Sequence, residues 1–229
     1  VRFIASVLAG PTLIANVGNS NLEAEDLLSF ELGYRFRTSD NFSLELSGFY
    51  NFYDDLLVTE RGTGFIEGTP APSHTLIPVT FENNGNGEFF GAEISATWKV
   101  NPQWTLKSGF SYLHNDLSTD PVSTSTTFSS KEGLDAETQY NISSYLDLPY
   151  DLELDSMLYF VNSLHRFNTP SYTRLDLRIG WNPTKKFQLS FSGQNLLDPD
   201  HPEFESVSNG TASGSLIQRS FYLKGTWNF

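Results

Sequence analysis

Apolar and polar residues alternate one by one along most of this chain. Between Leu28 and Phe36 every second residue is apolar, and the residues in between are Ser, Glu, Gly and Arg. A period of two is typical of β-strands with one apolar and one polar face. The alternation predicts nine strands, and residues 1–8 look like the tail of a tenth. The nine cover residues 27–37, 42–53, 79–100, 104–112, 140–148, 152–160, 174–181, 187–194 and 220–229. With no helical period and no low-complexity linker, we expect one all-β domain over residues 1–229.

The connections between these strands alternate in length. Short turns are predicted at residues 38–41, 101–103, 149–151 and 182–186. Long loops are predicted at residues 54–77, 115–136, 162–170 and 198–215. Short periplasmic turns and long external loops are typical of outer-membrane barrels, whose strands of about 9–11 residues cross the bilayer at a tilt. The pattern therefore predicts a transmembrane antiparallel up-and-down β-barrel in the bacterial outer membrane, with its long loops extracellular and its short turns periplasmic.

The tryptophans favour this barrel over a soluble β-sandwich. Trp98, Trp104, Trp181 and Trp227 lie on the apolar faces of their strands, beside a short turn or at the C-terminus. A sandwich gives indoles no reason to gather at one end, whereas a membrane interface does. We expect these four residues to form the periplasmic aromatic girdle. The opposite strand ends supply a second girdle of Tyr50, Phe52, Tyr112, Tyr140 and Phe160.

Composition excludes several classes of partner. The chain has 14 Lys and Arg against 27 Asp and Glu, a net charge of −13, whereas nucleic-acid binding needs a basic surface. The same charge argues against docking on an anionic membrane surface. Mean hydropathy is −0.30, and no run approaches the roughly 18 apolar residues of a transmembrane helix. Barrel strands escape that test, because only alternate residues face lipid. Residues 1–5 lack a secretion signal, which an outer-membrane protein needs, so we expect a truncated or processed chain.

Candidate chemistry is sparse. Without Cys there is no disulfide, thiolate metal site or thiol nucleophile. Gly85, Gly87 and Gly91 do not have the spacing of a phosphate-binding loop, and we expect them to let a strand bend or to let a plug inside the barrel approach. The histidines lie in or beside predicted long loops without ligand-like spacing; they are His74, His114, His165 and His201. No Ser stands beside a base, so we predict no enzyme, no cofactor and no metal site.

Several segments resemble the TonB-dependent receptor family. They are residues 19–25 (NSNLEAE), 30–35 (FELGYR), 48–57 (GFYNFYDDLL), 84–93 (NGNGEFFGAE), 193–198 (GQNLLD) and 227–229 (WNF), in family order. The resemblance implies a 22-stranded barrel around an N-terminal plug, with uptake driven by TonB. It makes this chain the C-terminal portion of the barrel, with about nine or ten strands and no counterpart of the plug. It also implies that Trp227 and Phe229 resemble the terminal signal read by the barrel-assembly machinery.

Charged residues on the polar faces are the candidate functional residues. They are Glu31, Arg35, Arg37, Glu45, Glu93, Lys99, Lys107, Asp147, Glu153, Asp155, Arg174, Asp176, Arg178 and Lys224. A substrate path, a plug-docking surface and a merely wet lumen wall all fit such a set. The residues that bind ligand are not identified.

Three functions remain open at this point. The leading one is TonB-driven uptake of a scarce ligand of the ferric siderophore, cobalamin or oligosaccharide class. The expected partners are then outer-membrane lipid, the missing plug and strands, the TonB complex through the plug, and the barrel-assembly machinery. The alternatives are a passive porin-like channel and a soluble lectin-like sandwich.

Overall fold

The chain folds as two compact units built from β-strands. The computed structural model describes residues 2–8, 12–69, 71–126, 128, 132–165, 168–204 and 215–229. Unit 1 comprises residues 1–30, 50–89 and 115–132, and unit 2 comprises residues 31–49, 90–114 and 133–229. Within the described ranges there is no α-helix, and hence no helix long and apolar enough to cross a membrane. Four strands contribute to both units: β3 (Asp26–Ser39), β4 (Phe42–Arg61), β6 (His74–Asn101) and β7 (Trp104–Thr119).

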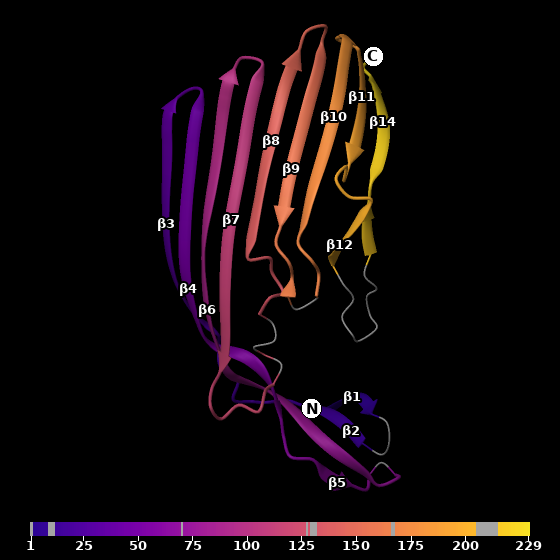
Figure 1. The fold of residues 1–229 in the computed structure, drawn as a ribbon. Coiled ribbons are helices and arrows are strands. Elements are labelled where there is room, and N and C mark those ends of the chain that lie inside the picture. The colour runs from indigo at the N-terminus through magenta and orange to yellow at the C-terminus, as the bar shows by residue number, and fades with distance from the viewer. Residues whose placement is uncertain are drawn as a thin grey trace. The chain divides into compact units, whose positions relative to one another are not determined.

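Unit 2 is an open up-and-down sheet. Its remaining strands are β8 (Thr138–Leu148), β9 (Leu152–Val161), β10 (Tyr172–Thr184), β11 (Phe187–Gln194) and β14 (Ser220–Trp227). The spatial order is β3-β4-β6-β7-β8-β9-β10-β11-β14, so the strands follow one another as they do in the sequence (Figure 1). Among the described strands, the first and the last each pair with a single neighbour in this sheet. The predicted all-β antiparallel fold is confirmed, and the sheet is not closed.

Strand register gives the sheet of unit 2 one apolar and one polar face. Leu158 of β9 lies opposite both Ile142 and Leu175. Phe191 of β11 lies opposite both Ile179 and Leu223. Because paired residues share a face, these side chains form one continuous apolar surface. Its members Ile142, Ile179, Phe191 and Leu223 are exposed, so no layer of described residues covers this face.

Short connections in unit 2 lie at one end of the sheet. The turns that follow β6, β8 and β10 are all at the upper end of the sheet in Figure 1, together with the C-terminus. Tyr150 and Asp151 make the turn between β8 and β9 with φ values of 68° and 58°. The connections from β9 to β10 and from β11 to β14 lie at the other end. The short turns therefore fall where the sequence predicted them.

The long loops are shorter than the sequence predicted. β4 continues to Arg61, β5 (Phe65–Glu67) follows, and β6 begins at His74, so strands occupy most of the predicted loop 54–77. Asp55 has a φ of 59°, and such a left-handed residue interrupts the alternation from which strands are predicted. β7 likewise reaches Thr119. The predicted loop 198–215 contains β12 (Asp200–Phe204) and the start of β13 (Ser215–Gln218), which pair together, and residues 205–214 lie outside the described residues.

The N-terminal segment is not the tail of a tenth barrel strand. β1 (Arg2–Leu8) and β2 (Thr12–Val17) form an antiparallel hairpin within unit 1. β2 then pairs in parallel with β6, from Thr12 opposite Thr75 to Asn16 opposite Val79. A parallel neighbour does not belong to an up-and-down meander, so that prediction was wrong. Val1 lies outside the described residues.

Unit 1 has a small apolar core of its own. Val58, Leu117 and Phe128 are buried there, with Leu56 and Phe89 packed against them. Two of the glycines that the sequence singled out, Gly85 and Gly87, lie against these side chains. They permit close packing inside unit 1.

Candidate functional site

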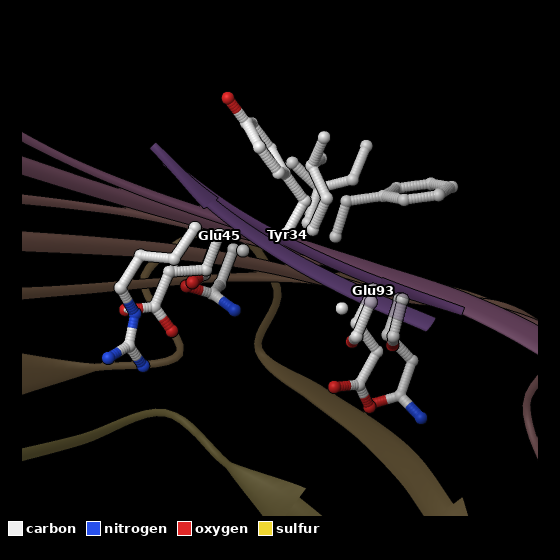
Figure 2. Close-up of a pocket in the computed structure, with 14 residues that line it drawn as sticks. Tyr34, Glu45 and Glu93 are labelled. Carbon is white, nitrogen blue, oxygen red and sulfur yellow. Dashed lines mark ion pairs between the residues drawn. The ribbon is translucent and has the colours of Figure 1, made fainter. Parts of the chain in front are cut away.

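A polar hollow lies on one face of unit 2, across β3, β4, β6, β7 and β8. It has a volume of about 570 Å³ and includes Arg35, Glu45, Glu93 and Asn141 in its lining. Arg35 Nε lies 2.8 Å from Glu45 Oε1, although both side chains are well exposed. Figure 2 shows Glu45 and Glu93 on one side of the strands and Tyr34 on the opposite side. The charged residues that line the polar hollow therefore lie on the face opposite the apolar surface, whereas Tyr34, which also lines it, lies on the apolar face.

A second polar group joins β9 to β10. Arg178 Nη1 donates to Glu153 Oε2 at 2.8 Å and to Asp155 Oδ2 at 2.7 Å. Asn182 Nδ2 donates to Glu153 Oε1 at 2.6 Å. One guanidinium thus lies between two carboxylates on the neighbouring strand, and such charge-assisted bonds are stronger than neutral ones. The guanidinium offsets one of the two carboxylate charges, so this group keeps a net charge of −1.

A third group fixes the β12–β13 hairpin to β10. Arg174 binds Asp176 with two bonds, Nε to Oδ1 at 2.9 Å and Nη2 to Oδ2 at 2.6 Å. Asp176 Oδ1 also accepts the backbone N–H of Asn195 at 3.0 Å. Asn195 Nδ2 donates to Ile217 O at 3.0 Å, and Arg219 Nε donates to Asn195 O at 3.3 Å.

Asn195 was not among the residues expected to matter. It is fully buried and has a φ of 52°, a conformation that asparagine tolerates better than most residues. In the sequence, Asn195 belongs to the GQNLLD segment, which indicated only a resemblance to the receptor family and no role for this residue. The structure identifies it as the link between β10, β11 and β13.

Except for Glu93, which lines the polar hollow, the remaining predicted charged residues lie outside these three groups. Lys107 Nζ lies 5.5 Å from the centre of the Tyr145 ring. Within the described part of the chain, the following make no ion pair: Glu31, Arg37, Glu93, Lys99, Lys107, Asp147 and Lys224. Two smaller hollows of about 170 and 130 Å³ share Arg178, Ser192 and Tyr222. The polar face can thus hold water, or contact a polar surface, at several points along its width.

The four tryptophans lie close to the short turns of unit 2. Trp98 and Trp104 flank the turn between β6 and β7, and Trp104 Nε1 donates to Ser144 Oγ at 2.9 Å. Trp181 lies opposite Leu152, the first residue after the β8–β9 turn. Trp227 lies opposite Phe187 with ring centres 5.6 Å apart. Phe229 follows as a fully exposed terminal residue. The placement suits an interfacial girdle, which stays a prediction.

The residues of the predicted second girdle include two ring pairs. Tyr140 stacks on Phe160 in unit 2 with centres 4.8 Å apart. Tyr50 and Phe52 lie 4.6 Å apart in unit 1. Tyr112 lies on the apolar face of β7, opposite Thr138.

Three of the four histidines lie beside a glutamate. His74 Nε2 is 3.4 Å from Glu67 Oε2, and His114 Nδ1 is 3.4 Å from Glu137 Oε1. His201 Nε2 is 3.5 Å from Glu203 Oε1, and its ring stacks on Tyr172 with centres 4.2 Å apart. Among the described residues, no group of three His, Cys, Asp or Glu side chains is placed to hold a metal ion.

Comparison with known proteins gives consistent matches. Residues 4–196 match the family described as TonB dependent receptor-like, beta-barrel. The pesticin receptors of Yersinia enterocolitica and Yersinia pestis are 20% and 21% identical over 198 residues. That alignment covers 82% of this chain and 27% of each relative, so the chain spans about a quarter of their length.

Solved structures share the fold. The ferric yersiniabactin uptake receptor of Yersinia pestis superposes with a TM-score of 0.65 at 17% identity, over 90% of this chain and 30% of that one. The siderophore receptor PirA from Acinetobacter baumannii gives 0.69 at 16%, over 95% and 34%. The copper transporter OprC gives 0.62 at 15%, over 92% and 33%. These matches are receptors and transporters rather than enzymes, as the sequence predicted.

Proposed function

The chain belongs to the TonB-dependent receptor family and forms part of its β-barrel, and we propose that the protein containing it takes up a scarce ligand through the bacterial outer membrane. The observation that carries the proposal is the two-faced sheet of unit 2. Its apolar face is exposed, whereas its polar face holds ion pairs and a hollow of about 570 Å³. A wall with lipid on one side and water on the other requires this distribution.

The ligand class that we favour is a ferric siderophore. Structural neighbours of this chain are named for ferric yersiniabactin uptake and for siderophore reception. Another neighbour is named a copper transporter, so a metal complex is the common theme of these names. Cobalamin and oligosaccharide remain the other classes to test.

The proposed orientation places the short turns in the periplasm and the long connections outside the cell. Trp98, Trp104, Trp181 and Trp227 then form the periplasmic girdle, where an amphipathic indole is favoured. Trp227 and Phe229 are proposed to be read by the barrel-assembly machinery. Energy from the TonB complex would reach the ligand through a plug, which the polar face of unit 2 is proposed to contact.

Uptake in whole cells tests the proposal. The complete polypeptide is expressed in cells that lack other receptors for these ligands, and entry of a radiolabelled ferric siderophore, a cobalamin and an oligosaccharide is measured in turn with and without TonB. We expect uptake that depends on both the protein and TonB. Entry that persists without TonB would instead identify a passive channel, and entry of none of the three ligand classes would contradict the proposal.

A further inference from the structure

β5 is an edge strand of unit 1 that is firmly held on one side. Its three residues lie opposite β6 in antiparallel register, Phe65 with Leu76, Ile66 with Thr75 and Glu67 with His74. Just before the strand, Gly62 N donates to Pro78 O at 2.9 Å. At its end, Glu67 Oε2 lies 3.4 Å from His74 Nε2. Contacts with β6 therefore order the strand along one edge.

The other edge of β5 is open to a further strand. Among the described strands, β5 pairs with β6 and with no other. In a β-strand, successive residues direct their N–H and C=O groups toward opposite edges. One of the two neighbours Phe65 and Ile66 must therefore present both groups away from β6. An exposed edge of this kind is a template for another chain.

Apolar side chains accompany this open edge. Phe65 and Ile66 are 51% and 80% exposed, and adjacent strand residues point to opposite faces. Natural edge strands are protected by very short length, charged side chains, Pro or a covering element, and β5 has the first two of these in its three residues and in Glu67. β5 contains neither Lys nor Pro, and the residues before it are Gly62, Thr63 and Gly64, which offer little shielding. The edge can thus provide backbone hydrogen bonds and an apolar contact on each face.

The charge of unit 1 selects the partner. It contains twelve Asp and Glu residues against three Lys and Arg, which gives −9 of the chain's total of −13. Glu67 lies beside His74, and no other described carboxylate of this unit makes an ion pair with a Lys or Arg side chain. A basic segment would gain attraction on approach, whereas a second copy of this chain would be repelled.

We propose that the open edge of β5 binds an extended, basic segment of a protein partner by strand addition. In strand addition, backbone hydrogen bonds contribute affinity for any extended segment, and side-chain contacts determine which segment is preferred. Three residues span only about 10 Å, so the contact is short and the surrounding negative charge is needed to support it. The inference rests on the proposed function in one respect. The proposed orientation places unit 1 outside the cell, where a protein partner can reach it.

Peptide binding to the complete polypeptide, purified from outer membranes in detergent, tests this proposal. The probes are fluorescent heptapeptides of alternating Val and Lys, of alternating Val and Glu, and the Val-Lys peptide with a central Pro. We expect the Val-Lys peptide to bind, the Val-Glu peptide to bind about tenfold more weakly or worse, and high salt to weaken binding. The Pro peptide should lose binding, because it cannot complete the strand. Equal binding of the acidic and basic peptides, or no effect of Pro, would overturn the proposal.

Two matched variants locate the site. Ile66→Ser removes an apolar side chain from the edge, and Val122→Ser makes the same kind of change at a residue of unit 1 that is 78% exposed and lies outside β5. We expect binding of the Val-Lys peptide to weaken about fivefold in Ile66→Ser and to stay unchanged in Val122→Ser. Equal effects of the two changes, including none from either, would contradict the assignment to β5.

Hydrogen exchange in the unmodified protein locates the peptide without any substitution that could disturb folding. In the unmodified protein, the Val-Lys peptide should slow hydrogen exchange of the amides in residues 64–67, and it should leave residues 121–124 unaffected. Protection confined to other segments would place the peptide elsewhere and overturn the proposal. Ligand uptake in cells is measured independently of peptide binding, so failure here leaves the proposed transport function standing.

Discussion

Gly85 is a residue at which close packing in unit 1 leaves no room for a side chain. An added Cβ would lie 2.8 Å from Leu56 O, 2.8 Å from Phe128 Cζ and 2.9 Å from Val58 Cγ1. Because the backbone oxygen cannot give way without moving β4, Gly85→Ala should destabilise unit 1 by about 1–3 kcal/mol. Gly68→Ala is the matched control, since a Cβ there meets no atom within 4 Å. Hydrogen exchange at Val58 and Leu117 should accelerate only in Gly85→Ala, and equal rates in both variants would contradict the packing argument.

Glu60 gives unit 1 a pH-dependent contact. It is 7% exposed and lies seven residues beyond residue 53, where the predicted spanning strand ends. Burial alone would raise its pKa, but hydrogen bonds from Ser123, Thr124 and Asn84 outweigh burial and lower the pKa to about 2. The carboxylate thereby fastens the segment that follows β7 to β4.

The folded pKa lies below the ordinary value of 4.5, so the sign of the effect is fixed. The contribution of Glu60 should be fully present above about pH 4.5 and be lost as pH falls toward 2. The shift corresponds to about 3 kcal/mol as an order of magnitude. Protection of the Thr124 amide, which donates to Glu60 Oε2 at 2.6 Å, should fall over that range. Glu60→Gln should remove this pH dependence, and an unchanged profile in the variant would refute the role of the carboxylate.

At the scale of elements, β14 shows how one strand serves two environments. Leu223 is 67% exposed and lies opposite Phe191 on the apolar face, whereas Tyr222 lies opposite Ser192 on the polar face. We expect Leu223→Lys to cost about 2–4 kcal/mol near mid-membrane, and Tyr222→Lys to cost clearly less. Urea unfolding from lipid bilayers measures both. Spin labels at these two positions with equal exposure to lipid-soluble oxygen would contradict the assignment of the faces.

Strand faces could be predicted from the sequence because the period of two is a local property. The predicted strands 140–148 and 152–160 correspond to β8 at Thr138–Leu148 and β9 at Leu152–Val161. The extension of β4 was missed because Asp55, with its positive φ, interrupts the alternation. The start of β6 at His74 was missed because Pro78, a residue that rarely stands inside a strand, precedes the predicted start at Val79. β2 was missed as a separate element because its parallel partner lies more than 60 residues away.

The polar face was predictable as a set of charges but not as a set of contacts. The pairing of Arg178 with Glu153 and Asp155 depends on the register between β9 and β10, which no local pattern contains. The role of Asn195 likewise depends on two separate segments, since its hydrogen bonds reach Asp176 and Ile217, which lie 19 and 22 residues away in the sequence. Such residues are found only when neighbouring strands are placed.

At the scale of the whole molecule, the number of strands restricts how the barrel can close. The sheet of unit 2 contains nine strands in up-and-down order, with β3 and β14 at its edges and seven strands between them. Nine is an odd number, so the two edge strands run in the same direction. Joining β14 to β3 of the same chain, or of a second copy around a barrel axis, would create a parallel pair. Bacterial single-chain barrels are antiparallel and have an even number of strands. The strands that complete the wall should therefore be odd in number.

Leaving the edges open in lipid is not an alternative. An edge of ten residues exposes about five donors and five acceptors, and each costs several kcal/mol in hydrocarbon. That total exceeds the roughly 5–15 kcal/mol that stabilises an ordinary domain. We therefore predict that these 229 residues alone do not form a closed barrel, and that both edges pair with strands from outside this segment.

Engineered cysteines test this prediction directly, because the chain contains no Cys of its own. Arg35→Cys on β3 and Lys224→Cys on β14 place one thiol on each edge strand of the complete polypeptide in outer membranes. Since Cα atoms must lie within about 7 Å for a disulfide to form, direct closure would bring these strands within reach and antiparallel completion by other strands would not. We expect no disulfide between positions 35 and 224 after mild oxidation, whereas cysteines introduced at paired positions 189 and 225 should cross-link. Efficient formation of the 35–224 disulfide would show that the nine strands close on themselves, and the requirement for an odd number of added strands would then be wrong.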